Sequence, residues 1–209
     1  HFPWLAHYLV NNRISRQPYF HEVYERWIRS FGEPSLVKEV LARSIGSARK
    51  LLASPRIRTD ANERSLLKSL GAWLGRLTLR RNRPLLQIDI DLKELLYQGY
   101  ENGAMIGVVP FVAKVLEAAK GSEVFQPPNP WVMGLLGSLA ELYDVENLKL
   151  NIKFEVEVLC KNLSPDGGKA IVVADIRRKE QLSVPLLAPF GPSLIGLEMN
   201  LAHVLVDGT

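Results

Sequence analysis

The sequence predicts an all-α protein: a HEAT-type helical-hairpin solenoid of about five hairpins, followed by a less regular C-terminal tail. Apolar residues recur at spacings of three and four as far as residue 163, which is the period of helices that bury one face. The segments between these stretches carry prolines, glycines and N-capping residues, which are typical of helix boundaries. Successive helical pairs span roughly 40 residues, the repeat length of HEAT-type hairpins that stack into curved arrays.

The first two long helices are predicted from their start signals. Pro18 suits the first turn of a helix over 18–31, because its missing N–H has no partner there in any case. Ser35 is expected to cap a second helix over 35–53. The spacing in the first helix predicts one buried face. That face comprises Phe20, Val23, Trp27 and Phe31.

The third helix, over 62–80, carries Gly71 and Gly75 one turn apart. A glycine inside a helix costs about 1 kcal/mol relative to alanine. Close approach of a neighbouring backbone is the expected compensation, because no side chain stands in its way. Asp91 then predicts the cap of a helix over 91–102, with an acidic residue three positions later completing a capping box.

Proline shapes the next two helices. Pro110 within 105–120 either starts that helix or kinks it. The run of prolines at 127–130 is followed by a helix over 130–144, with Asn129 as its cap. We expect the helices to pair in chain order. The predicted hairpins are 18–31 with 35–53, 62–80 with 91–102, and 105–120 with 130–144.

The segment 148–163 fits two periods. Its alternating apolar residues fit a strand, whereas spacings of three and four also fit a helix, which we favour in an otherwise helical chain. We therefore predict a helical-repeat scaffold domain over 1–163. Residues 164–209 are rich in β-branched residues and proline and are interpreted as a linker or docking tail. The leucine spacing near its end is compatible with a final helix.

Composition sets broad limits on the class of protein. The net charge of +4 and the pI near 9.2 permit acidic partners or RNA without requiring them. The single cysteine, Cys160, excludes an internal disulfide framework and indicates a reducing compartment. No apolar run reaches the roughly 18 residues of a membrane span. The N-terminus lacks the pattern of a signal peptide and reads as a fragment cut from a longer protein.

Catalytic, metal and cofactor sites are not expected. The four histidines are scattered, and none has metal-ligand spacing to another ligand. Asp89 and Asp91 form a candidate magnesium pair, but a helix cap is the simpler interpretation of Asp91. The run "GGKA" at 167–170 lacks the full spacing of a phosphate loop. No general base accompanies Cys160, which predicts a buried, inert thiol.

Basic residues spaced by four on helix 62–80 form a candidate binding ridge. Such a ridge attracts an acidic protein patch or RNA phosphate, and the alternative is a solvated face. Trp73 lies on the same helix, either in the core or as an exposed anchor. The ridge comprises Arg64, Lys68, Arg76 and Arg80, with Arg81 and Arg83 at its end.

Trp131 follows three prolines in "PPNPW". The prolines restrict the backbone before the helix begins, so the direction of the indole is preset. The ring then either wedges between hairpins and sets the curvature of the solenoid, or acts as a preorganised binding anchor.

Four stretches of the sequence together resemble one family. They are "PWLAHYLVNNRISRQPYFHEVY" (3–24), "ERSLLKSLGAWLGRLTLRRNRPLL" (63–86), "VVPFVAKVLEAAKGSEVFQPPNPWVMGLLGSLAEL" (108–142) and "LKLNIKFEVEVLCKNL" (148–163). In this order they resemble the central domain of the large scaffold subunit (Not-one) of the CCR-NOT mRNA deadenylase complex. That domain is of the class typified by the middle domain of translation initiation factor four-G. The resemblance does not extend to 164–209.

The resemblance implies a HEAT-type solenoid without catalysis of its own and two principal partners. One is the Caf-type deadenylase subunit. The other is a DEAD-box RNA helicase of the decapping-activator type, held through its second RecA-like lobe so that its ATPase is modulated. It further implies contacts with other subunits of the complex, translational repression, RNA contact only indirectly, no membrane, and a place in the cytoplasm (P-bodies), with the nucleus left open.

Individual contact residues are predicted from the residues themselves, within the matching stretches. An RNA-binding solenoid that uses the ridge Arg64–Arg83 remains the alternative, and a metal-dependent hydrolase using Asp89 and Asp91 ranks third. The candidate partner-binding residues are Lys68, Trp73, Arg76, Arg80, Trp131, Lys149 and Lys153.

Overall fold

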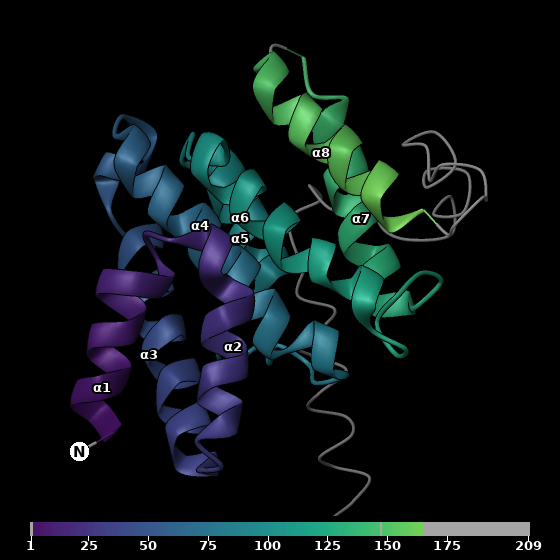
Figure 1. The fold of residues 1–209 in the computed structure, drawn as a ribbon. Helices are drawn as coiled ribbons and strands as arrows, with labels where there is room; N and C mark the ends of the chain where they lie inside the picture. Colours follow the sequence, from purple (N-terminus) through teal and green to yellow (C-terminus); the bar gives the residue numbers. More distant parts are fainter. Residues whose placement is uncertain (1, 147, 165–209) are drawn as a thin grey trace, which may run out of the picture.

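The computed structural model describes residues 2–146 and 148–164, and these residues are helical with no strand among them, as the sequence predicts (Figure 1). The ambiguous segment 148–163 is a helix. The predicted tail 165–209 lies outside the described residues. No helix within the described part has the length and apolar character to cross a bilayer. The helices are α1 (Phe2–Tyr8), α2 (His21–Ser30), α3 (Pro34–Leu52), α4 (Ala61–Leu77), α5 (Leu92–Glu101), α6 (Met105–Glu117), α7 (Pro130–Tyr143) and α8 (Leu150–Leu163).

Two of the predicted caps are confirmed. Asp91 and Asn129 each accept hydrogen bonds from the backbone N–H groups two and three residues further on, at 3.0–3.2 Å, and so satisfy donors that the first helical turn leaves free. The predicted cap at Ser35 is wrong, because α3 already begins at Pro34. Pro110 lies inside α6, five residues after its start, so it does not open the helix.

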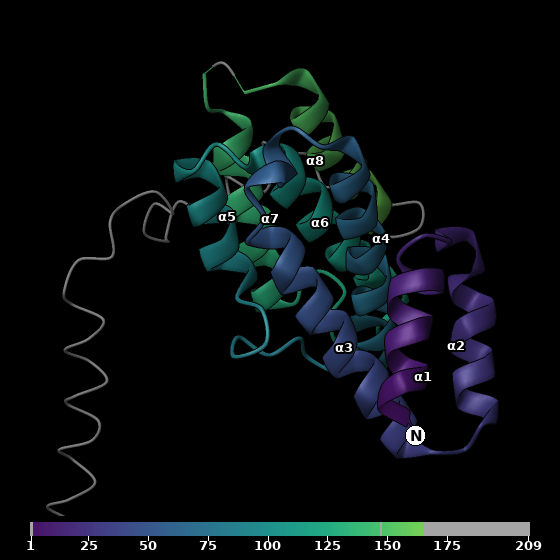
Figure 2. The ribbon, with the colours of Figure 1, turned by 90° about the vertical axis from the view of Figure 1, so that its left-hand side faces the viewer.

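The helices pair one position later than the sequence suggested. The principal partner of α4 is α6 rather than α5, and α6 in turn packs on α8 (Figure 2). Helices that follow one another in the chain also pack together, and the hairpins that they form are α3–α4, α5–α6 and α7–α8. Helices α1 and α2 precede them at the N-terminal end. The connections explain this register. Only three residues, 102–104, join α5 to α6, whereas 78–91 separate α4 from α5.

The contact between α4 and α6 is close, as the two glycines predict. A Cβ on Gly71 would lie 2.7 Å from the Phe111 carbonyl oxygen, and one on Gly75 would lie 2.5 Å from the Val115 carbonyl oxygen. Both distances are shorter than a real Cβ tolerates, so only glycine allows this backbone approach. The surrounding core is continuous. Its largest fully buried side chains include Trp73, Phe111, Leu36, Leu70, Leu96, Leu116 and Leu136.

Helix α2 is held to the rest of the molecule by polar contacts. The Glu25 carboxylate accepts a hydrogen bond from Arg76 Nε at 3.0 Å and another from Arg81 Nη2 at 2.8 Å. Burial by itself raises the pKa of Glu25, but Arg81 and Arg76 outweigh that effect and hold the pKa below its usual value. One turn earlier, the His21 ring lies 2.8 Å from the Ile14 carbonyl oxygen, with burial lowering its pKa.

Asn82 joins the loop after α4 to the loop after α6. Its backbone is left-handed, with φ 58°, a conformation that asparagine tolerates better than most residues. The side-chain oxygen accepts hydrogen bonds from Ser122 Oγ at 2.7 Å and from the Glu123 N–H at 2.9 Å. The loop after α4 is thereby tied to the loop after α6.

The α4–α6 contact predicts an asymmetry between glycines. Gly75→Ala should lower the free energy of unfolding by about 1–3 kcal/mol, because its Cβ overpacks the Val115 carbonyl. Gly134→Ala is the control, since a Cβ there meets no atom within 4 Å. It should be neutral or stabilising by up to about 1 kcal/mol. Urea unfolding followed by circular dichroism measures both, and equal effects would contradict the close approach.

The lowered pKa of Glu25 predicts sensitivity to acid. Above the ordinary carboxyl value of 4.5 its charge stabilises the folded state fully, and that contribution is lost as the pH falls through the lower folded-state pKa. Glu25→Gln should cost about 3 kcal/mol at neutral pH, because it leaves the partly buried Arg76 and Arg81, and the exposed Arg29, without their carboxylate. Its stability should then fall less steeply than that of the unmodified protein below pH 4.5. Glu123→Gln is the control, because the Glu123 side chain is exposed. The stability of this variant should depend on pH in the same way as that of the unmodified protein.

Candidate protein-binding surfaces

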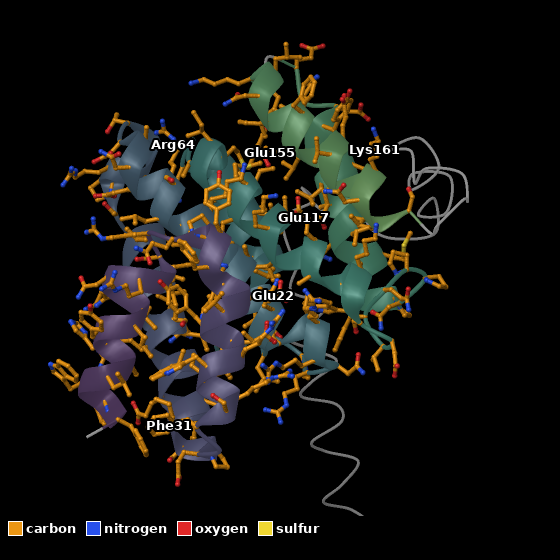
Figure 3. All side chains as sticks on the ribbon, viewed as in Figure 1. Glu22, Phe31, Arg64, Glu117, Glu155 and Lys161 are labelled. Atoms are coloured by element: carbon orange, nitrogen blue, oxygen red, sulfur yellow. The ribbon has the colours of Figure 1, made fainter. Side chains whose placement is uncertain are left out.

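The predicted basic ridge on α4 is largely used within the protein. Lys68 forms an ion pair with Glu155 of α8, and Arg64 donates a hydrogen bond to the Ile57 carbonyl oxygen at 3.3 Å. Figure 3 labels Glu155 and Arg64. Arg76 is held by Glu25, as described above. These cations therefore help to join helices, and a continuous row of free charges along α4 is absent.

A basic groove remains where α4 faces the end of α6. It has a volume of about 450 Å³. Lys114 in this groove is hydrogen-bonded to Glu117 at 2.6 Å, whereas Arg80 and Lys120 are exposed and form no ion pair with a described residue. Arg76 and Arg80 belong to the predicted ridge, whereas Lys114 and Lys120 were not predicted, because they lie on α6 and in the 3-10 turn that follows it. We call it the α4–α6 groove; its cations are Arg76, Arg80, Lys114 and Lys120.

Trp73 is a core residue, so it cannot serve as an exposed anchor. Its side chain is completely buried, and its ring packs edge-to-face on His21 with the centroids 5.3 Å apart. Of the two interpretations left open by the sequence, the structure therefore selects the core.

Trp131 combines features of both of its predicted roles. Asn129 caps the helix in front of it, and the ring packs edge-to-face on Phe125 with the centroids 5.9 Å apart. The indole still exposes 38% of its surface. It lines a groove of about 410 Å³ together with Leu85, Ile90 and Leu135, from α7 and the segment before α5. Binding of a partner by Trp131 stays a prediction.

Helix α8 presents Lys149, Lys153 and an apolar row. Lys149 is exposed in front of the helix, and Lys153 Nζ lies 5.1 Å above the centre of the Tyr143 ring. The cation–π contact orients Lys153 along the α7–α8 surface. Binding of partners by these two lysines also stays a prediction. The exposed apolar row on the same helix comprises Leu150, Phe154 and Val158.

Helix α2 turns its apolar side outward, so the predicted buried face is wrong. The sequence predicts that the face of Phe20, Val23, Trp27 and Phe31 lies in the core, yet these residues are between 40% and 58% exposed. The buried positions of α2 are instead His21, Glu25 and Ile28. On this inner side Glu25 pairs with Arg76 and Arg81, and Ile28 joins the hydrophobic core. We call the exposed face the α2 stripe; it comprises Phe20, Val23, Trp27 and Phe31.

The α2 stripe continues into neighbouring aromatic rings. Phe31, at the C-terminal end of the stripe, packs on Trp27 with ring centroids 5.5 Å apart and on Phe2 of α1 at 6.3 Å (Figure 3). Tyr19, just before the stripe, is 95% exposed. Exposed apolar residues that adjoin one another in this way are typical of protein-binding surfaces. The signal in the sequence was the glutamate and histidine between the aromatic positions of α2, which mark the opposite face as the anchored one.

The described residues offer little for catalysis. No group of three or more His, Cys, Asp or Glu side chains within them could hold a metal ion. Asp91 is occupied as a helix cap. Cys160 is buried, and burial, with a smaller effect of Glu157, raises its pKa to about 11, so the thiol is protonated at neutral pH. The run 167–170 lies outside the described residues.

Comparison with known proteins identifies the family. The sequence matches the family described as the CCR4-NOT transcription complex subunit 1 CAF1-binding domain over residues 1–183. It is 38% identical to General negative regulator of transcription subunit 1 of Schizosaccharomyces pombe over 78% of this chain. It is also 39% identical to CCR4-NOT transcription complex subunit let-711 of Caenorhabditis elegans over 86% of this chain.

A Saccharomyces cerevisiae protein, also named General negative regulator of transcription subunit 1, is 36% identical over 78% of the chain. The match spans only 7–8% of the length of these relatives, so the chain corresponds to one segment of much longer proteins. The match to the family covers most of the chain and includes every described helix. The chain therefore belongs to the family of the CAF1-binding domain of CCR4-NOT transcription complex subunit 1.

Proposed function

We propose that this domain is a non-catalytic scaffold segment that holds a Caf-type deadenylase, and that the α2 stripe is the docking surface. The observation that carries the proposal is the outward-facing aromatic side of α2, on a chain whose family is named for binding CAF1. An amphipathic helix normally buries its apolar side. When a helix presents this side to solvent, a protein that covers it removes apolar surface from water, and this burial favours binding.

The contacts beneath α2 support this proposal. Glu25 is anchored on its inner side by two arginines, so the outer side is held in position before a partner arrives. Preorganised surfaces lose less conformational entropy on binding. Tryptophan is also enriched among the residues that dominate binding energies, and Trp27 lies within the stripe.

We further propose a DEAD-box helicase as the second partner, contacted at the α4–α6 groove. The resemblance to the four-G middle-domain class motivates this partner, and the exposed charges of Arg80 and Lys120 suit an acidic patch on its second RecA-like lobe. Binding one lobe in a fixed orientation would bias the open–closed equilibrium of the helicase and so modulate its ATPase. Other subunits of the complex, mRNA deadenylation, translational repression and a cytoplasmic, P-body location follow from the same resemblance, with the nucleus as a second location.

Direct RNA binding along the ridge is the alternative, and the structure offers it less support. Lys68 and Arg76 are engaged by Glu155 and Glu25, so fewer charges are free for phosphates than the sequence suggests. We therefore propose that RNA is contacted only indirectly.

The α2 stripe predicts a specific loss of deadenylase binding. Val23→Glu combined with Trp27→Ala should weaken binding of the Caf-type deadenylase by roughly 100-fold, because two central contacts of about 2 kcal/mol or less each are removed. Calorimetric titration measures the affinity, and circular dichroism should show that the variant stays folded, with only a small drop in melting temperature from the lost contact of Trp27 with Phe31.

The matched control is Leu150→Ala with Phe154→Ala, a comparable apolar loss on α8 that should leave the deadenylase affinity unchanged. If the unmodified chain does not bind the deadenylase at micromolar concentration, the proposed function is wrong. Unchanged affinity in the α2 variant would refute only the docking surface. Light scattering would reveal the other occupant of the stripe, a second copy of this chain.

The α4–α6 groove predicts a charge-dependent loss of helicase binding. Arg80→Glu with Lys120→Glu should weaken binding of the isolated second lobe by roughly tenfold at low salt, and less at high salt. Arg76 is left intact, because its ion pair with Glu25 supports the fold. Reversal of Lys93 and Lys161, which are exposed on other helices, changes the net charge equally and should leave helicase binding intact. Equal losses in both variants would indicate a nonspecific charge effect.

A further inference from the structure

A third groove lies between α1 and α3, and these two helices run side by side (Figure 2). It has a volume of about 450 Å³. Its walls come from the end of α1 with the π-helical turn Leu9–Ile14 and from α3, and its floor is formed by Leu51 at the end of α3 together with Leu66 and Leu70 of α4. We call it the α1–α3 groove. It shares no lining residue with the α4–α6 groove and none with the α2 stripe.

The floor of the α1–α3 groove is apolar. Leu51 and Leu66 are half-buried and present aliphatic surface to the groove, and Leu70, which is only 1% exposed, lines it beside them. All three floor residues are leucines, so the floor contributes no polar side chain to the groove. Such a floor suits an apolar side chain of a ligand rather than a charged group.

The rim of the groove is basic. Arg16 and Lys50 are exposed and Arg43 is half-buried, and none of them forms an ion pair with a described residue. Glu39 is the one carboxylate among the described lining residues. The groove thus has a net positive charge around an apolar floor, and this pattern is complementary to a ligand that is acidic outside and apolar at its centre.

The walls are fixed relative to each other. Ser47 Oγ of α3 donates a hydrogen bond to Asn11 Oδ1 of the π-helical turn at 3.0 Å, across the two walls. The Asn11 carbonyl oxygen accepts further bonds from Ser15 Oγ at 3.0 Å and from Arg16 Nε at 3.3 Å, which positions the Arg16 side chain. π-Helical turns occur frequently at functional sites.

We propose that the α1–α3 groove binds a short acidic peptide segment of a partner protein, with an apolar side chain of the segment seated on the leucine floor. The peptide fits better than RNA, because the described lining contains no aromatic ring other than the His7 imidazole on which a base could stack. The groove is a separate site from the two surfaces proposed above, so this inference stands whether or not they bind their partners.

The test uses the whole chain and a fluorescein-labelled peptide, Gly-Ser-Glu-Asp-Leu-Glu-Asp-Leu-Glu-Ser-Gly. Fluorescence anisotropy should show binding in the micromolar range that weakens with salt. Two comparison peptides separate the contribution of the negative charges from that of the apolar side chains. One has Gln and Asn in place of the acidic residues, and the other has Ser in place of the leucines. Each should bind roughly tenfold more weakly.

The protein variants locate the site. Arg43→Glu with Lys50→Glu should weaken peptide binding by roughly tenfold or more, whereas Lys93→Glu with Lys161→Glu, an equal change of net charge outside the groove, should leave it unchanged. Backbone amide shifts on peptide addition should be largest at Asn11, Gly46 and Ser47, a readout that needs no variant.

Three results would overturn the proposal. They are no anisotropy change when the protein is titrated to roughly millimolar concentration at low salt, shifts that map to α2 or to the α4–α6 groove, and equal weakening by both double reversals. Labelled oligoadenylate is titrated in parallel. If it binds and loses affinity in the groove variant while the peptide does not bind, the groove is an RNA site and the peptide proposal is wrong.

Discussion

The contact of Glu25 with Arg76 and Arg81 determines which side of α2 faces the rest of the molecule. A carboxylate at the inner side of a helix requires compensation for lost hydration, and two guanidinium groups supply it. Because that side is fixed by charge, the aromatic side is left in solvent, where a partner can reach it. One ion-pair cluster thus stabilises the N-terminal part of the fold and, in the same geometry, leaves an exposed aromatic surface on α2.

Among the remaining helices, close packing is the main constraint, and the ion pair between Lys68 of α4 and Glu155 of α8 adds to it. Gly71 and Gly75 let α4 approach the α6 backbone, and the even-numbered helices α4, α6 and α8 then follow one another in a row. Contacts of this kind leave little freedom between neighbouring helices, since packed interiors transmit rather than absorb displacement. A scaffold that orients large partners benefits from this stiffness, because the grooves keep their shape before anything binds.

The sequence predicted features that depend on local chemistry. The helices, the caps at Asp91 and Asn129 and the close approach at Gly71 and Gly75 follow from residues near one another in the chain. Features that depend on distant partners were missed or reversed. The inward side of α2 is set by Arg76 and Arg81, which lie about fifty residues away. The register of the hairpins depends on loop paths, and no periodicity distinguishes α4 packed on α5 from α4 packed on α6. For the same reason the charge spacing on α4 could not reveal that Lys68 is paired with Glu155.

Asn82 has a mechanical consequence. In many repeat proteins each repeat touches only its neighbours, so local fraying can begin at any boundary and travel along the array. Here the side-chain oxygen of Asn82 holds the loop after α4 to the loop after α6, by accepting hydrogen bonds from Ser122 and Glu123. Bending at that boundary would break several hydrogen bonds at once. These hydrogen bonds should therefore stiffen the boundary between the α3–α4 and α5–α6 hairpins against bending.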